Sequence, residues 1–147
     1  MEYKQKSFFR RKKDNSGSMA QFSLMDNKKD RSVFLELSNQ LDEKSFDYEH
    51  KIVVKLNSED LSQILMVLEG TIESIGNEGK GLIHSFNDIY TNIYFKKYDG
   101  TPPRFTLSIS RKNGENIEKR SITLFYHEGV ILRELIRYAV VHISHWC

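Results

Sequence analysis

The sequence predicts an α+β protein made of two β-β-β-β-α repeats, each an antiparallel sheet with a helix on one face. The first observation is a repeat about 70 residues apart, in which SVFLELSNQ, KIVVKLN and SEDLSQILMVLEG have counterparts in RFTLSISR, RSITLF and the apolar segment after residue 127. The second is the period-two alternation of apolar and polar residues in the strand-like segments. The third is the helical apolar period that closes each half. We therefore expect residues 1–75 and 76–147 to form two repeats of one compact domain, packed about a pseudo-twofold axis.

In the first repeat, four segments have the alternation of strands. They are Tyr3–Arg11, Met19–Met25, Ser32–Ser38 and Lys51–Leu56, with a hairpin tip at Asp26–Asp30. A helix then begins after Asn57 or Ser58, because either side chain can cap a helix N-terminus. The acidic Glu59 and Asp60 suit the positive end of its dipole. We expect one buried stripe on this helix, formed by Leu61, Ile64, Leu65 and Leu68.

The second repeat has the same order of elements. Strands are expected at Leu82–Phe86, Thr91–Tyr98, Arg104–Arg111 and Arg120–Phe125, followed by a helix from about Glu128 to Ile143. The glycines between residues 73 and 81 mark the joint between the repeats. The last helix should bury Leu132, Leu135, Ile136 and Ala139. Its further apolar residues, among them Tyr138 and Val141, exceed one core face and predict self-association as a dimer or tetramer.

Charge is distributed unevenly along a chain of 147 residues whose net charge is +2. Residues 1–31 contain nine Lys/Arg and four Asp/Glu, residues 32–80 contain four and ten, and residues 81–147 contain nine and six. Basic surfaces attract polyanions through counterion release. The alternative interpretation is an ordinary solvated surface. If the basic segments bind a polyanion, the acidic middle predicts weaker binding by the first repeat than by the second.

The open face of each predicted sheet is where we expect function, because the helix covers the other face. The alternation assigns to these open faces Phe34, Lys51, Lys55, Tyr94, Lys96, Tyr98, Arg104, Thr106, Ser108 and Phe125. Rings among cations and small hydroxyls suit a single-stranded nucleic acid, whose bases stack on the rings while cations hold phosphates. Duplex DNA needs a helix or ribbon in its major groove, and neither helix is basic enough. The competing interpretation is cross-strand aromatic pairing for stability alone.

Two segments carry a resemblance to a known group of proteins. GENIEKRSITLFYHEGVILRELI resembles the closing part of the positive-cofactor-four coactivator domain, with its Gly/Glu turn, basic pair, Ile-Ser/Thr-Leu strand and final helix. The segment from SVFLELSNQ to KIVVKLNSEDLSQILMVLEG is similar. A β-β-β-β-α unit present twice resembles the Whirly arrangement and the related Pur-alpha repeats. The lysine-glycine-lysine-alanine signature of plant Whirly proteins is absent, since the nearest position reads Ser18-Met19-Ala20.

The resemblance implies a protein that binds single-stranded DNA, or RNA, without catalysis. It places Lys119 and Arg120 at the basic pair before the last strand, and Lys96, Arg104 and Arg111 on strands that face nucleic acid. Together with the alternation, it gives the expected nucleic-acid-binding set: Phe34, Lys51, Lys55, Tyr94, Lys96, Tyr98, Arg104, Arg111, Lys119 and Arg120. The alternative function is a protein-interaction module or transcriptional cofactor that does not itself bind nucleic acid.

Other kinds of chemistry lack a pattern in this sequence. There is no Gly-rich phosphate loop with Lys-Ser/Thr, no paired Cys motif and no Gly-x-Ser-x-Gly elbow, so we expect neither an enzyme nor a cofactor. His142, His145 and Cys147 are too few for a structural metal site. One cysteine and the lack of an apolar leader or an 18-residue apolar run predict a cytoplasmic protein, nucleoid-associated if prokaryotic, without membrane contact.

Overall fold

Two four-stranded antiparallel sheets form the framework of the protein. The computed structural model describes residues 2–26 and 30–146, so Cys147 and most of the predicted tip at Asp26–Asp30 lie outside the described residues. The first sheet comprises β1 (Glu2–Arg10), β2 (Ser18–Asp26), β3 (Arg31–Asn39) and β4 (Ile52–Leu56), and α1 (Ser58–Leu68) follows it. The second sheet comprises β5 (Leu82–Phe86), β6 (Ile89–Tyr98), β7 (Arg104–Asn113) and β8 (Asn116–Leu124), and α2 (Tyr126–Ile143) follows it. The predicted fold class is therefore confirmed.

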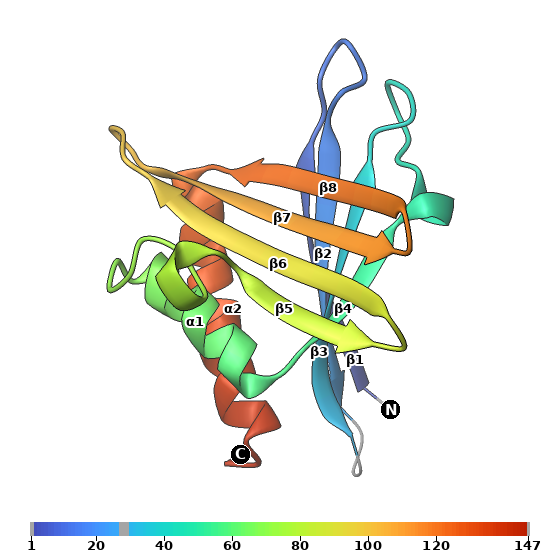
Figure 1. Cartoon of the computed structure of the whole chain (residues 1–147). Helices are drawn as coiled ribbons and strands as arrows, with labels where there is room; N and C mark the ends of the chain where they lie inside the picture. The colour runs from blue at the N-terminus through green and yellow to red at the C-terminus, as the bar shows by residue number, and fades with distance from the viewer. Residues whose placement is uncertain (1, 27–29, 147) are drawn as a thin grey trace.

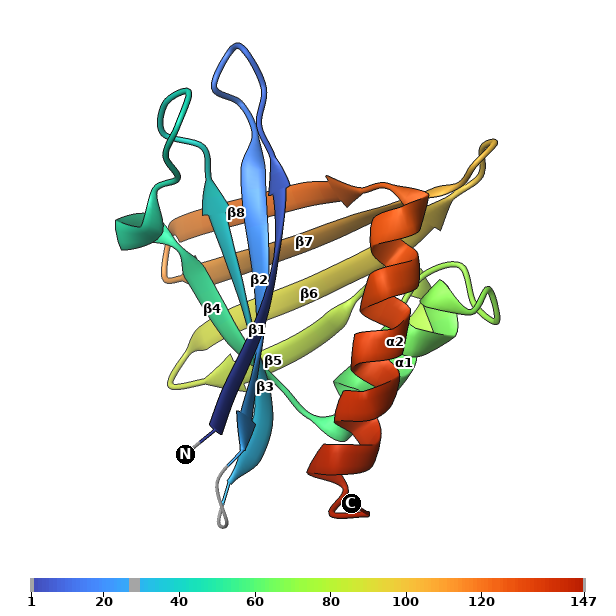
Figure 2. The ribbon, with the colours of Figure 1, turned by 180° about the vertical axis from the view of Figure 1, so that it is seen from behind.

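The two sheets face each other with their strands crossed, and both helices lie together beside them (Figures 1 and 2). β8 contacts β1, β2 and β3 across the interior. α1 packs on β6 of the second sheet as well as on β4, and α2 contacts both β3 and β7. Each sheet therefore buries one face against the other sheet and against both helices. On the opposite faces, Met19 and Ser38 of the first sheet are still buried, whereas Tyr90 and Tyr98 of the second sheet are exposed.

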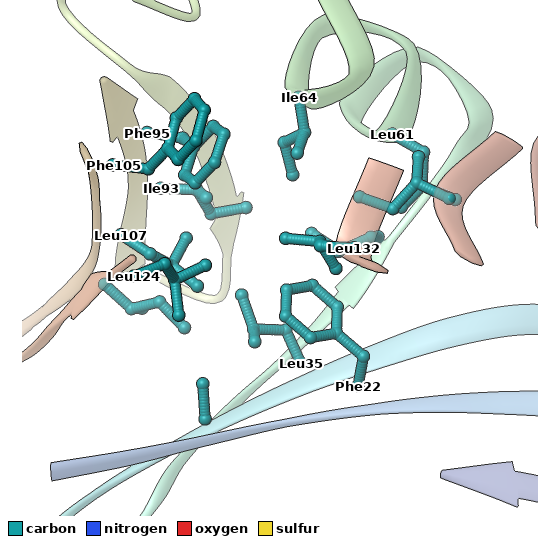
Figure 3. Packing of buried hydrophobic residues seen from close by; sticks show 14 of the residues in the cluster. Phe22, Leu35, Leu61, Ile64, Ile93, Phe95, Phe105, Leu107, Leu124 and Leu132 are labelled. Carbon is teal, nitrogen blue, oxygen red and sulfur yellow. The ribbon is translucent and has the colours of Figure 1, made fainter. Parts of the chain in front are cut away.

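The core lies where the two inner faces and the helices meet (Figure 3). Leu35, Leu107 and Leu132, from the two sheets and α2, are each fully buried in it. Phe95 and Phe105 stack with ring centroids 5.6 Å apart. The period-two alternation predicted for β3, β4, β7 and β8 is confirmed, because these strands bury alternate apolar residues. Burial of this apolar surface is the main favourable term in folding.

Local sequence fixes where α1 begins. The Asn57 side chain accepts a hydrogen bond from the Asp60 backbone N–H at 2.8 Å, and the Asp60 carboxylate accepts one from the Asn57 N–H at 3.0 Å. This reciprocal capping box satisfies two backbone donors at the helix start. Leu61 and Ile64 are then fully buried, as predicted, whereas Leu65 is half-buried at the edge of the core.

The joint between the halves is tightly folded. The Ile75 N–H donates to the Phe95 carbonyl, and the Lys97 N–H donates to the Glu73 carbonyl. Residues 73–75 therefore pair with β6 just beyond Leu82, where β5 begins. Gly76 has a positive φ of 86°, and a Cβ added there would lie 2.0 Å from the Gly81 carbonyl oxygen. A side chain at position 76 would collide with this backbone turn.

The last helix presents a narrower buried face than its sequence predicts. Leu132 and Ile136 are buried, whereas Leu135 is 41% exposed, so the expectation that Leu135 is buried is wrong. Gly129 explains how closely α2 approaches the sheet, because a Cβ there would lie 2.4 Å from the Phe105 ring. This close approach turns the 132–136–139 stripe inward and leaves the neighbouring 131–135–138 stripe facing out.

Candidate nucleic-acid interface

The open face of the second sheet carries alternate side chains of β6, β7 and β8. The register sets them in rows across the sheet: Asn92–Ser110–Lys119, Tyr94–Ser108–Ser121 and Lys96–Thr106–Thr123, with Tyr98 opposite Arg104. Five of the sequence-predicted binding residues are brought together here, namely Tyr94, Lys96, Tyr98, Arg104 and Lys119. The strand period and the antiparallel register together produce this convergence, because residues two apart share a face and paired strands lie side by side.

The tyrosines of this face are not used in ring packing. Among the described residues, Tyr94 and Tyr98 form no ring–ring pair, and their cross-strand neighbours are Ser108 and Arg104. Tyr98 is 45% exposed, and the Lys96 ammonium lies over its ring at 5.1 Å. Cross-strand aromatic pairing therefore does not explain these rings, which remain accessible to a planar ligand.

Between the tyrosines and β8 lies an open groove of about 350 Å³. Its floor is made of small hydroxyl residues, among them Thr106, Ser108, Ser110 and Ser121. The Ser108 and Ser121 hydroxyls share a hydrogen bond of 2.9 Å. Hydroxyls both donate and accept hydrogen bonds, so such a floor suits base edges of either polarity. Their small size lets a flat ligand come close to the sheet.

The charge of this face has one sign. Lys96, Arg104, Lys112 and Lys119 project from it, and no strand residue on it is an Asp or Glu, because Glu118 pairs with Arg111 on the inner side. Unopposed cations beside accessible rings raise the local concentration of anionic ligands. This combination of cations and accessible rings suits a polyanion that also has aromatic groups.

The first sheet places its predicted binding residues differently. Phe34 and Lys55 are cross-strand neighbours on its open face, and Lys51 precedes β4. Lys51 pairs with Glu36 at 3.1 Å, and Lys55 pairs with Asp30 at 3.5 Å. Both cations therefore have carboxylate partners within the same half. They are therefore less available to a polyanion than the cations on the open face of the second sheet.

The structure places Arg111 and Arg120 on the inner side of the second sheet, away from the tyrosines. Arg111 donates to the Thr91 hydroxyl at 3.0 Å and to the Val53 carbonyl of β4 at 2.6 Å. Arg120 donates to the His50 carbonyl at 3.0 Å. The resemblance places Arg111 on a strand that faces nucleic acid and Arg120 in the basic pair, but both side chains lie on the other side of the sheet from Lys96 and Arg104. Their guanidinium groups join the two sheets instead.

Phe125 also differs from the sequence-based expectation. β8 ends at Leu124, and Phe125 is the residue before the first turn of α2, where its N–H donates to Glu128 at 2.9 Å. Its ring lies between two guanidinium groups, with Arg10 at 3.9 Å and Arg104 at 5.1 Å. Arg10 also forms an ion pair with Glu128. Phe125 therefore anchors the helix start and holds Arg104 at the end of the open face.

Two residues of the face were missed by the sequence analysis. β6 begins at Ile89 and β7 ends at Asn113, so both strands extend further than their predicted limits. Tyr90 and Lys112 are thereby opposite each other in the row beyond Asn92, and Tyr90 is 50% exposed. The alternation 90, 92, 94, 96, 98 continues through Tyr90 and was the available signal. The adjacent turn residues obscured it.

Shifted pKa values are found at loops of the first half. Hydrogen bonds from Ser16 lower the pKa of the Asp14 carboxyl, and the backbone N–H of Lys44 lowers that of Asp42. A hydrogen bond to Asp47 raises the pKa of the His50 imidazole. Among residues 2–26 and 30–146, no three His, Cys, Asp or Glu side chains are grouped to hold a metal. No helix in the same ranges has the length and apolar character to cross a bilayer.

Solved structures show what this arrangement resembles. The sequence matches no protein-family model and has no significant match among curated proteins. WHY1 from Arabidopsis thaliana superposes with a TM-score of 0.79 at 14% identity, over 99% of this chain and 88% of that one. The plant transcriptional regulator PBF-2 gives 0.77 at 14% identity, over 99% and 85%. The chain has the Whirly fold.

The likeness to solved structures is not confined to plant proteins. A guide-RNA-binding protein complex bound to a gRNA superposes with a TM-score of 0.71 at 16% identity, over 95% of this chain and 91% of that chain. The expected resemblance in fold is therefore confirmed over nearly the whole chain, although the identity is low.

Proposed function

We propose that the protein binds single-stranded nucleic acid, with DNA favoured and RNA as a second ligand, on the open face of the β5–β8 sheet. The observation that carries this proposal is a face with exposed tyrosines and four cations, no strand carboxylate, and a floor of small hydroxyls. Base stacking on such rings contributes about 1–3 kcal/mol per base. The flanking cations neutralise phosphates in a salt-dependent way.

The helices favour single strands over duplex DNA. α1 contains no Lys or Arg, and in α2 Arg137 pairs with Glu134 and Glu69 while Arg133 pairs with Glu134. Neither helix offers the unpaired cationic side that enters a major groove. A flat sheet face with accessible rings requires unstacked bases, which a duplex does not provide. The gRNA-bound neighbour and the transcriptional regulator among the similar structures are consistent with this function.

A binding panel with a salt titration tests the proposal. Single-stranded DNA, single-stranded RNA and duplex DNA of equal length are titrated into the protein at several salt concentrations. We expect single strands to bind much more tightly than duplex, with a log-linear loss of affinity as salt rises. Equal binding of all three ligands, or none, contradicts the proposal.

The same panel addresses the alternative function, a protein-interaction module or transcriptional cofactor without direct nucleic-acid binding. That alternative predicts no binding to any of the three nucleic acids and an apolar interface that tolerates salt. The exposed apolar stripe of α2 is the observation that favours protein contact, and we assign it to self-association into a dimer or tetramer. We propose the cytoplasm as the compartment, on the basis of the lone cysteine.

A further inference from the structure

A second cleft lies on the other side of the β5–β8 sheet, where the sheet extends past β4. In Figure 1 the β5–β6 hairpin projects beyond the edge of the first sheet, so the end of its inner side is not covered by that sheet. The cleft is about 580 Å³, within the usual range for small-ligand sites. Its walls come from both halves, with Lys55 on β4, His84 and Phe86 on the hairpin, and Arg111 on β7.

Three side chains with nitrogen donors or acceptors line this cleft, namely Lys55, His84 and Arg111, and no described Asp or Glu lines it. The Arg111 guanidinium is fixed by its hydrogen bonds to Thr91 and to the Val53 carbonyl. The Lys55 ammonium has only a loose ion pair with Asp30, in which both side chains are more than half exposed. His84 Nε2 lies 3.0 Å from the carboxylate of Asp60, a buried residue that does not line the cleft. A guanidinium fixed by hydrogen bonds and an exposed ammonium in the same cleft are suited to a phosphate group.

The remaining wall is apolar and includes an aromatic ring without a packing role. Phe86 is 76% exposed, although it stands on a β-strand of the second sheet. Ile89, its cross-strand neighbour, and Val53 complete this apolar side. Among the described residues, the Phe86 ring pairs with no other ring and lies under no cation. An exposed ring next to a cationic wall offers a stacking surface for an aromatic base.

We propose that this cleft binds a nucleoside monophosphate group, with the base on Phe86 and the phosphate on Arg111 and Lys55. The shared chemistry is a base joined to a terminal phosphate, whether as a free mononucleotide or as the phosphorylated end of a strand. The site is distinct from the open face that carries Tyr94 and Tyr98, here called the tyrosine face. Arg111 and Phe86 lie on the opposite side of the same sheet. It stands independently of the function proposed for that face.

The first experiment is calorimetric titration of thymidine 5′-monophosphate into the whole chain. We expect one site per chain and at least about a 5-fold loss of affinity in Phe86→Ala, since one stacked base corresponds to a factor of about 5 to 150. Lys55→Ala should weaken binding by a similar factor and reduce its salt dependence. Both positions are exposed, so neither variant should affect folding.

Matched controls separate the cleft from the tyrosine face. Ile83→Ala changes an exposed residue of the same strand that points to the other side, and Tyr94→Ala removes a ring of the strand-binding face. Neither should alter mononucleotide affinity. Loss of mononucleotide binding in Tyr94→Ala with full binding in Phe86→Ala overturns the proposal and leaves the strand-binding face intact. Competition by inorganic phosphate as strong as by the mononucleotide also overturns it, because the base then contributes nothing.

The second experiment distinguishes the two sources of the ligand. Affinities are compared for a thymidine decamer with a 5′-phosphate and the same decamer with a 5′-hydroxyl. A preference for the phosphorylated end that disappears in Phe86→Ala assigns the cleft to strand ends, whereas equal affinities together with mononucleotide binding assign it to free nucleotides. The site is rejected if the mononucleotide does not bind at millimolar concentration and the decamer shows no preference for a phosphorylated 5′ end.

Discussion

Tyr94 and Tyr98 project from the same strand face, yet their surroundings differ. The Lys96 ammonium lies over the Tyr98 ring, whereas Tyr94 stands opposite Ser108 with no cation over its ring among the described residues. A base that stacks on Tyr98 must therefore displace or share this lysine. The two rings are four residues apart, about 13 Å along the strand, which leaves room for a nucleotide between two stacked ones.

Truncation of these rings tests the stacking role. Tyr94→Ala should weaken single-stranded binding by about 1–3 kcal/mol, and Tyr98→Ala by the lower part of that range, because Lys96 already occupies its ring. The measurement is fluorescence anisotropy with a labelled oligonucleotide. Tyr48→Ala is the control, since Tyr48 is exposed but lies outside this face. Wild-type affinity in a folded Tyr94→Ala protein would show that the face does not stack bases.

The cations of the same face should act through phosphates. Lys96→Ala and Arg104→Ala should each lower the slope of log affinity against log salt by about 0.7, the value for one phosphate contact with a single strand. Lys51→Ala provides the comparison, because Lys51 is paired with Glu36 on the first sheet. An unchanged slope in both face variants, measured across the salt series, contradicts their phosphate contacts.

The pKa of His50 is raised by a neighbouring carboxylate, and this shift can be measured by titration. The Asp47 carboxylate, within 2.9 Å of Nδ1, raises the pKa of His50 above its ordinary 6.5. The stabilisation from this pair is fully present below the unfolded pKa and disappears as pH rises through the folded pKa. NMR titration should show the raised value in the wild type and a normal one in Asp47→Asn. The same pKa in both proteins would exclude the pair as the cause.

At the scale of elements, α2 shows why a helical stripe does not by itself define a core face. Its apolar residues cover more than one side, and the periodic pattern fits both the 132–136–139 and the 131–135–138 stripe. The close approach of Gly129 to Phe105 decides between them. The sequence also predicts that β7 ends at Arg111, whereas the strand continues to Asn113. Turn residues such as Asn113 continue the hydrogen-bonded ladder when the hairpin is tight.

Two leucines three residues apart on α2 should therefore differ in stability effect. Leu132→Ala should lower the free energy of unfolding by about 2–5 kcal/mol, the usual cost of a truncated core leucine. Leu135→Ala should cost much less in the monomer, because its side chain is 41% exposed. Urea unfolding of both variants at low protein concentration measures the difference. Equal losses would mean that the helix is rotated from the position described.

At the scale of the whole molecule, arginines hold the two halves together. Arg10 of β1 donates to the Thr123 carbonyl, while Arg111 and Arg120 donate to carbonyls of Val53 and His50. Guanidinium groups suit such bridges because they donate several hydrogen bonds in a fixed plane. Arg111 and Arg120, which the resemblance assigns to nucleic-acid binding, thus join the two halves of the fold.

The outer stripe of α2 should mediate self-association. Ile131, Leu135 and Tyr138 are each more than 40% exposed on adjacent turns, and contiguous apolar surface of this kind marks interfaces. Analytical ultracentrifugation should show a dimer or tetramer that Leu135→Lys shifts toward monomer. Leu41→Lys changes a more exposed leucine away from the helix and should leave assembly unchanged. A monomeric wild-type protein would remove the argument.

The sequence determined the local structure of this protein and its division into two similar halves. Period-two alternation fixed which residues of β3, β4, β7 and β8 face inward, and the Asn57 cap fixed the start of α1, because both depend on residues close in sequence. It also identified Tyr94, Lys96 and Tyr98 as neighbours, since they share one strand.

Tertiary structure alone decided which faces stay open. The alternation places Arg111 and Arg120 on the inward sides of β7 and β8, but it does not show that their guanidinium groups donate to carbonyls of the first half. Carboxylate partners distant in sequence occupy Lys51 and Lys55, and none stands on the tyrosine face. Such contacts join segments far apart along the chain, so periodicity within one segment carries no information about them.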